Sequence, residues 1–155
     1  MKRLRALGLL RDDDELPRSL LEACHEERLH GGLSLSLRAT PDEVMGPLTH
    51  AMGGRAAKAK LLDVRTTKGG PMVLDFTCGE LSCSWAVSGV EELIERLGEE
   101  FLDDDDVRQL VVLGEHEGML QVWALRPEVL ETLLFTSLLD GARNLRTLRE
   151  RFDLD

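Results

Sequence analysis

The sequence contains no tyrosine, only four phenylalanines and two tryptophans, and only three cysteines. Because aromatic rings are the usual stacking partners of nucleotide bases, this composition argues against nucleotide binding. An odd number of cysteines in 155 residues gives no disulfide framework, which is typical of a reducing cytosol. No apolar run approaches the roughly 18 residues that a membrane-spanning helix requires. We therefore expect a cytoplasmic protein without a membrane partner.

Signatures of catalysis and of cofactor binding are missing as well. The chain has neither the Gly-Lys-Ser/Thr of a P-loop nor a GxGxxG motif. No histidine is paired with a nucleophile at a spacing that sequence alone could interpret. These absences favour a non-catalytic protein with no cofactor.

The charge balance is strongly acidic, with a formal net charge of −10 and an isoelectric point of about 4.9. Such a field repels the phosphates of nucleic acids, so another protein, and preferably a basic one, is the expected partner. The content of hydrophobic residues, 43%, is that of a globular chain. We expect a flexible charged segment at residues 1–15 and a single domain at residues 16–155.

Hydrophobic periodicity and turn residues predict elements in the order αβαβββαββα. Helices are expected at residues 16–30, 40–52, 89–101 and from 127 onwards, and strands at residues 33–37, 61–67, 72–78, 80–88, 110–113 and 119–126. Short hairpins between most of the strands imply an α+β fold: a mainly antiparallel sheet of about six strands with helices packed on one face.

Two helices are preceded by capping signals. Thr40 is followed by Pro41 and Glu43, which is the pattern of a capping box with proline at the first helical position. Ser88 is followed by Glu91 at the same spacing and is the expected N-cap of the next helix.

The stretch TCGELSCSW contains Cys78 and Cys83. If Gly79-Glu80 is a two-residue turn, Phe76 pairs with Cys83, and alternation places both thiols on the apolar face with Trp85. The two cysteines then sit diagonally, about 7–8 Å apart, which is too far for a disulfide. A zinc site would need two more ligands. We interpret both as structural core cysteines and predict no metal site.

The opposite face of the predicted sheet is polar and rich in small side chains. It would carry Ser34, Ser36, Asp63, Arg65, Asp75, Thr77, Ser82 and Ser84. We predict that this polar sheet face is a binding surface.

Residues 91–106 contain nine carboxylates against Arg96 alone. The run lacks the alternating ligands and the central glycine of an EF-hand loop, so calcium is not implied. The cluster of carboxylates is explained by a solvent-exposed acidic end of the domain, and the alternative is a docking surface for a basic partner. The candidate acidic docking residues are Glu99, Glu100, Asp103, Asp104, Asp105 and Asp106.

One stretch is basic, with Asp63 as its only acidic residue. It contains Arg55, Lys58, Lys60, Arg65 and Lys68. The cluster is either the positive pole of a polarised molecule or the site of an anionic ligand, which would make the protein a small ligand-binding or enzymatic domain.

Two further patterns can be interpreted either as ordinary structural features or as functional sites. Cys24, His25 and His30 could bind a metal on one helix, but a solvated acidic helix face explains the segment better. Leu134, Leu138, Gly141, Leu145, Leu148 and Phe152 follow heptad spacing for barely two heptads. A C-terminal helix packed on its own sheet is favoured over a homodimer seam.

From about residue 40 onwards, the order helix, three strands, helix, two strands, helix is similar to that of class I type III secretion chaperones. The resemblance implies a small, acidic, cytoplasmic and usually dimeric protein. The helix and strand that precede residue 40 depart from this pattern. A chaperone, an adaptor or a toxin-neutralising immunity protein would each fit a non-catalytic protein-binding module.

Overall fold

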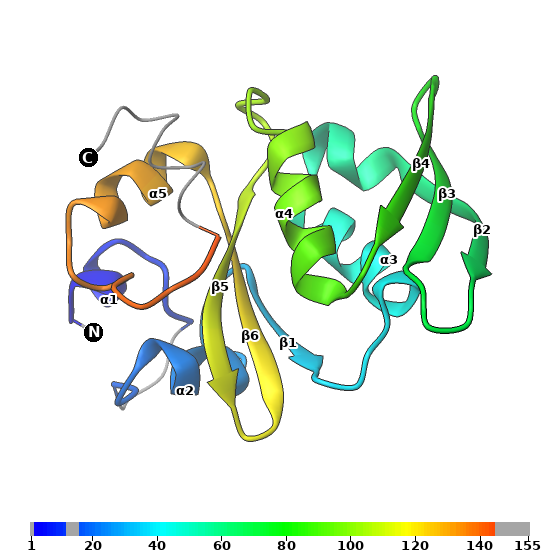
Figure 1. Cartoon of the computed structure of the whole chain (residues 1–155). Coiled ribbons are helices and arrows are strands. Elements are labelled where there is room, and N and C mark those ends of the chain that lie inside the picture. Colours follow the sequence, from blue (N-terminus) through cyan, green and yellow to red (C-terminus); the bar gives the residue numbers. More distant parts are fainter. Residues whose placement is uncertain (1, 12–15, 145–155) are drawn as a thin grey trace. The chain divides into compact units, whose positions relative to one another are not determined.

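The computed structural model describes residues 2–11 and 16–144 (Figure 1). Contacts group the chain into two compact units, one made of Met1–Leu37 with Leu110–Asp155 and the other of Arg38–Gln109. Both antiparallel sheets have three strands. The α+β class with antiparallel sheets is confirmed, but the prediction of one sheet of about six strands was wrong, because its strands are divided between two sheets.

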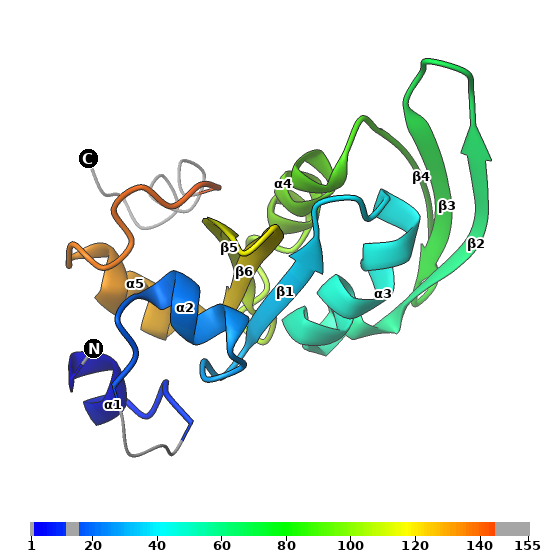
Figure 2. The same cartoon turned by 90° about the horizontal axis from the view of Figure 1, so that it is seen from below.

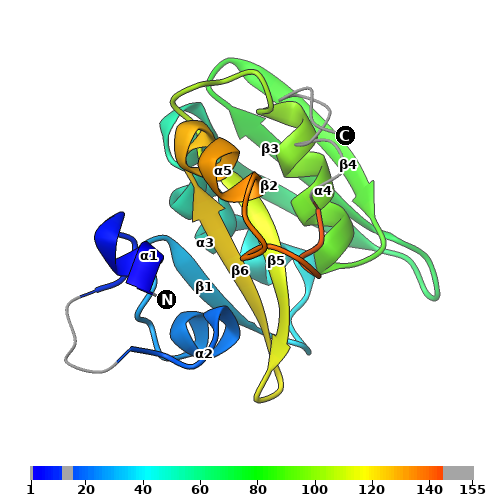
Figure 3. The same ribbon diagram turned by 90° about the vertical axis from the view of Figure 1, so that its left-hand side faces the viewer.

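The first unit is built around the sheet β1-β6-β5. Its elements are α1 (Lys2–Ala6), α2 (Leu20–His25), β1 (Gly32–Ser36), β5 (Gln109–His116, starting at the boundary), β6 (Met119–Leu125) and α5 (Pro127–Leu134). β1 runs antiparallel to β6, and α2 packs against both strands (Figure 3). Four consecutive residues of β5, from Gln109 to Val112, are buried, which is typical of a strand covered on both faces.

The N-terminal residues contribute to the core of the first unit. Leu4 of α1 is fully buried, and Leu10 forms an isolated antiparallel bridge with Leu29. The backbone N–H of Arg11 donates to the carbonyl of Arg28 at 2.8 Å. Residues 9–11, which belong to the segment expected to be flexible, therefore pair with the chain that follows α2.

The helix predicted at residues 16–30 is shorter than expected. It begins after Ser19, whose Oγ accepts a hydrogen bond from the N–H of Glu22, and its C-cap is Glu26. Glu27 then takes a positive φ of 60°, which ends the helical path. Leu29 fits the helical spacing of the apolar residues, but in the structure it pairs with Leu10 in an antiparallel bridge.

The second unit has two layers. Its elements are α3 (Pro41–Met52), the 3-10 helix η1 (Gly54–Lys58), β2 (Ala59–Thr66), β3 (Met72–Cys78), β4 (Leu81–Val87) and α4 (Val90–Glu100). The strand order is β2-β3-β4, and α3 and α4 lie on one side of this sheet (Figures 1 and 2). α3 contacts β2 and α4 contacts β4. Because β2 comes first in the strand order, it is an edge strand of this sheet.

The register of the β3–β4 hairpin is the predicted one. Phe76 pairs with Cys83 and Cys78 with Leu81. The rings of Phe76 and Trp85 meet edge to face, with centroids 4.8 Å apart and planes at 81°. Aromatic pairs in this arrangement stabilise a core beyond their buried area. Both cysteines share this face, which is the one that the helices cover.

The two capping predictions differ in outcome. The capping box at Thr40 is confirmed: the N–H of Thr40 donates to Oε1 of Glu43 at 3.0 Å. The prediction of Ser88 as an N-cap was wrong, because Gly89 holds that position. The N–H of Ser88 donates instead to a carboxylate oxygen of Glu92 at 2.9 Å.

α5, the last helix of the described residues, ends at Leu134. The next residues turn back, and Val112 forms an isolated antiparallel bridge with Arg143. The later positions of the heptad pattern, from Leu145 to Phe152, lie outside the described residues, so dimerisation through the C-terminal helix stays a prediction. None of the helices within the described part of the chain is long and apolar enough to cross a membrane.

Candidate protein-binding surface

The outer face of the β2-β3-β4 sheet, on the side away from α3 and α4, gathers most of the predicted polar residues. Strand pairing arranges them in three rows: Lys60, Thr77 and Ser82; Asp63, Asp75 and Ser84; and Arg65, Val73 and Ala86. No side chain in these rows is fully buried. Six of the predicted polar residues therefore share one face of the sheet: Asp63, Arg65, Asp75, Thr77, Ser82 and Ser84.

Ser34 and Ser36 do not belong to this surface, which corrects the prediction. Both are in β1, in the other sheet. Oγ of Ser34 accepts a hydrogen bond from Nε2 of the fully buried Gln121 at 3.0 Å and lies 3.4 Å from Nδ1 of His25. Alternation showed that Ser34 faces away from the leucines, but it could not show that α2 covers that side.

The centre of the outer face is an internal hydrogen-bond network. Oγ of Ser84 donates to Oδ1 of Asp75 at 2.6 Å, and Nη2 of Arg65 approaches the same oxygen at 3.2 Å. The hydrogen bond from Ser84, followed by the contact with Arg65, lowers the pKa of Asp75 below its ordinary value. Arg65 is therefore partly engaged within its own sheet.

Arg55 joins the basic cluster to the acidic segment. Its Nε and Nη2 lie 2.9 and 2.7 Å from the same oxygen, Oδ2 of Asp104. The guanidinium also lies over the ring of Phe101, 4.7 Å from its centroid. The hydrogen bond with Asp104 raises the pKa of Arg55. Arg55 is therefore held in place, and an anionic ligand would have to displace Asp104 to reach it.

The three lysines of the cluster are free of such contacts. Lys58, Lys60 and Lys68 are exposed, and none makes an ion pair within the described part of the chain. They lie at the end of η1, near the start of β2 and in the turn that follows β2. The positive charge is thus distributed along the edge strand rather than gathered around a pocket.

The predicted acidic docking residues occupy the end of α4 and the loop that follows. Those with exposed side chains are Glu99, Glu100, Asp103, Asp105 and Asp106. Asp104 is half-buried by its contact with Arg55. The acidic and basic segments therefore meet at this ion pair.

Sequence reasoning missed the exposed leucines of β2. Leu61 and Leu62 are 36% and 67% exposed, and the strand register shifts between Leu61 and Asp63, which indicates a β-bulge at Leu62. The signal was present in LLDVRTT, because two consecutive leucines break the alternation of a regular strand. β2 therefore combines two exposed leucines and flanking lysines with a sheet edge that no strand of the described residues covers.

The histidines and cysteines of the described residues make contacts other than metal ligation. Sγ of Cys24 donates to the carbonyls of Leu33 and Val122, and burial raises its pKa to about 11. The rings of His25 and His116 meet edge to face with centroids 5.4 Å apart. No group of three or more His, Cys, Asp or Glu side chains among the described residues could hold a metal ion.

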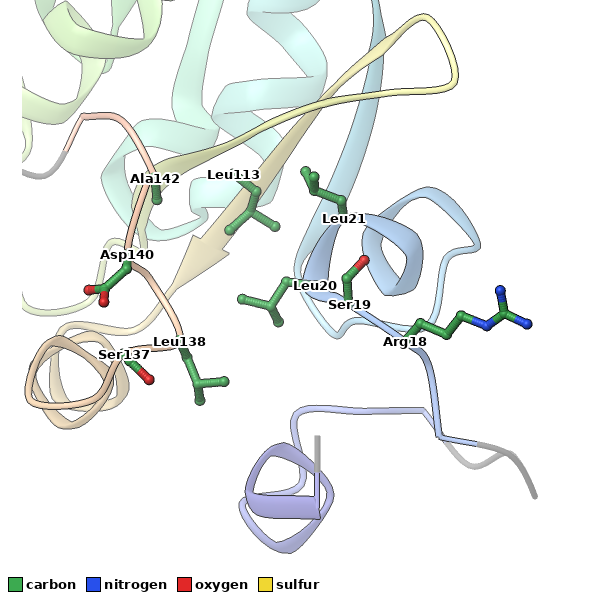
Figure 4. Close-up of a pocket in the computed structure, with 9 residues that line it drawn as sticks. All are labelled: Arg18, Ser19, Leu20, Leu21, Leu113, Ser137, Leu138, Asp140 and Ala142. Atoms are coloured by element: carbon green, nitrogen blue, oxygen red, sulfur yellow. The ribbon is translucent and has the colours of Figure 1, made fainter.

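A cavity of about 380 Å³ opens in the first unit, between α2, β5 and the chain after α5 (Figure 4). Leu20, Leu113 and Leu138 surround it, and Arg18 points away from it. Oγ of Ser19, also in the lining, accepts the capping hydrogen bond of α2. Ser137 and Asp140 also line it, so the cavity has a mixed lining of leucines and polar side chains.

Comparison with known proteins adds no relative to these observations. No family model matches the chain, and neither a curated protein nor a solved structure matches it. The likeness to type III secretion chaperones is thus limited to the order of the elements.

Proposed function

We propose that this protein is a non-catalytic, cytoplasmic protein-binding module, and that it binds its partner through the β2-β3-β4 sheet of the second unit. An adaptor, a chaperone or an inhibitor of another protein would all act in this way. The observation that carries the proposal is the distribution of exposed large apolar side chains. Among the described residues, Leu61, Leu62 and Leu81 of this sheet are exposed, and the other exposed large apolar side chains, Leu7, Leu37 and Phe135, belong to the first unit and are far apart in the sequence.

Two properties of the sheet support the proposal. Its outer face carries the small polar side chains Thr77, Ser82 and Ser84 next to the charged Lys60 and Arg65, so it offers a partner both hydrogen-bonding groups and positive charge. Adjacent exposed leucines on a sheet edge lose contact with water when a partner binds, which favours association. The rival function, binding of a small anionic ligand by the basic cluster, is disfavoured because Arg55 and Arg65 already contact Asp104 and Asp75.

Photo-crosslinking from defined positions tests this proposal. A photoreactive residue would be placed at Leu62 or Ser84 on the sheet and, as controls, at the exposed Glu95 of α4 and Glu131 of α5. We expect one discrete adduct with another protein from Leu62 and Ser84 in cells that produce this chain. Excess unlabelled protein should compete for it, and Leu61→Lys should weaken it. Equal adducts at all four positions, or none from the sheet, would refute the proposal.

A further inference from the structure

We infer that the free edge of β2 binds an extended segment of the partner as an additional strand, and that apolar residues in this segment alternate with polar ones, which are acidic beside Lys60 and Arg65. The inference rests on the proposed function and specifies the partner's chemistry. Strand addition to an exposed edge is a general mode of recognition, in which main-chain hydrogen bonds provide affinity and alternate side chains provide specificity.

The first observation is the free edge itself. β2 has eight residues and pairs with a single strand, β3. Its outer edge therefore presents backbone N–H and C=O groups that no strand within the described residues satisfies. Proteins commonly protect such edges with lysines and bulges, and β2 has both. The bulge makes the edge of β2 less able to pair with an arbitrary strand. The positive charges of its lysines favour a strand that carries acidic side chains.

The register determines which side chains an added strand would meet. Lys60 and Arg65 pair with Thr77 and Val73, so they lie on the outer face of the sheet. Acidic side chains of an added strand would lie beside them on that face, at the distance at which cross-strand pairs interact. Asp63 lies between them on the same face, so the partner position beside it should be neutral or basic.

The other face of an added strand would be apolar. Leu61 and Val64 pair with the buried residues Phe76 and Leu74, so their side chains lie on the helix-covered face, yet neither is fully buried. Apolar side chains on an added strand would cover them. The expected segment therefore reads acidic, apolar, neutral or basic, apolar, acidic.

Charge complementarity favours such a segment over a second copy of this chain. Residues 55–68 contain five basic residues and one acidic residue. A second copy would bring an equally basic strand to the edge, where like charges repel. An acidic segment of another protein would instead meet Lys58, Lys60 and Lys68, which have no ion-pair partner within the described residues.

A peptide array provides the test. Labelled eight-residue peptides would follow the expected pattern, and a matched array would carry Lys or Arg at the acidic positions. We expect the intact protein to bind the acidic array preferentially, with an affinity that falls as salt increases. The best peptide should lose about tenfold in affinity when alternate backbone amides are N-methylated, because these amides would donate to the edge.

Matched protein variants locate the binding site. Lys60→Glu with Arg65→Glu should weaken the best peptide by about tenfold or more. Arg18→Glu with Arg126→Glu, at exposed positions of the first unit, changes the net charge equally and should leave binding within about twofold. Equal binding of both arrays, or insensitivity to N-methylation, would overturn strand addition. Cross-links from Leu62 and Ser84 could still appear in that case, so the proposed function and this inference can fail separately.

Discussion

Both Nε and Nη2 of Arg55 contact a single carboxylate oxygen of Asp104, 49 residues further along the chain. This ion pair links η1 to the loop after α4, two segments that sequence reasoning treated as opposite poles. The attraction between these opposite charges favours the placement of the acidic loop beside η1.

The Arg55–Asp104 pair should contribute measurably to stability. Because both side chains are partly exposed, with 39% and 30% of their surface accessible, the coupling between them should be modest, about 1 kcal/mol. A double-mutant cycle of Arg55→Ala and Asp104→Ala, followed by urea unfolding, measures it. Lys58→Ala is the matched control and should change the free energy of unfolding by less than about 0.5 kcal/mol. A coupling of zero would mean that the pair plays no part in stability.

The three thiols should differ in their reactivity. Cys24 and Cys78 are buried, whereas Cys83 is half-buried and has a pKa raised mainly by burial. Since the thiolate is the reactive form, we expect slow labelling of Cys83 in the native protein at pH 8 and almost none of the other two. All three should react once the protein is unfolded. Mass spectrometry of single-cysteine variants distinguishes them, and rapid native labelling of Cys78 would contradict the observed register.

Cys24 should make stability depend on pH in the alkaline range. Its pKa is raised from 9.0 to about 11 in the folded protein, so the folded state holds this proton more tightly than the unfolded state does. The associated stability is fully present below pH 9 and is lost as the pH rises towards 11. The total is roughly 2 to 3 kcal/mol.

The check compares urea unfolding of the native sequence and of Cys24→Ala at several pH values between 8 and 11. The difference in free energy of unfolding between the two proteins should shrink as the pH rises. The chain has no tyrosine, so the number of other groups that titrate in this window is small. A constant difference would show that the thiol titrates equally in both states.

Gly54 should tolerate alanine less well than Gly79 does. Both glycines have a positive φ, 53° and 64°, so alanine is strained at either position by about 1 kcal/mol. A Cβ at Gly54 would also approach the carbonyl oxygen of Asp106 to 2.8 Å, whereas nothing lies within 4 Å of one at Gly79. Thermal unfolding should therefore show an additional loss of at least about 1 kcal/mol for Gly54→Ala. Equal losses would mean that the loop moves without cost.

Local signals in the sequence predicted the elements well. The capping box at Thr40 and the Gly79-Glu80 turn each depend on residues within a few positions of one another. Chain neighbours alone determine such features, because the competing conformations differ by local hydrogen bonds and sterics. The two errors at helix ends, at Ser88 and at residues 26–30, arose where a neighbouring residue or a distant bridge provided a better partner.

The sequence by itself determined the α+β class, the β3–β4 register and the face on which the cysteines lie, because period-two alternation and turn length specify all three. Only the tertiary structure decided that β1 pairs with β6, that α2 covers Ser34, and that Arg55 is bound to Asp104. The β1–β6 pairing and the Arg55–Asp104 contact join residues tens of positions apart, and many partners of similar chemistry were available to each. Which of them meet depends on the packing of the whole chain, and so does the exposure of the β2 edge on which the proposed function rests.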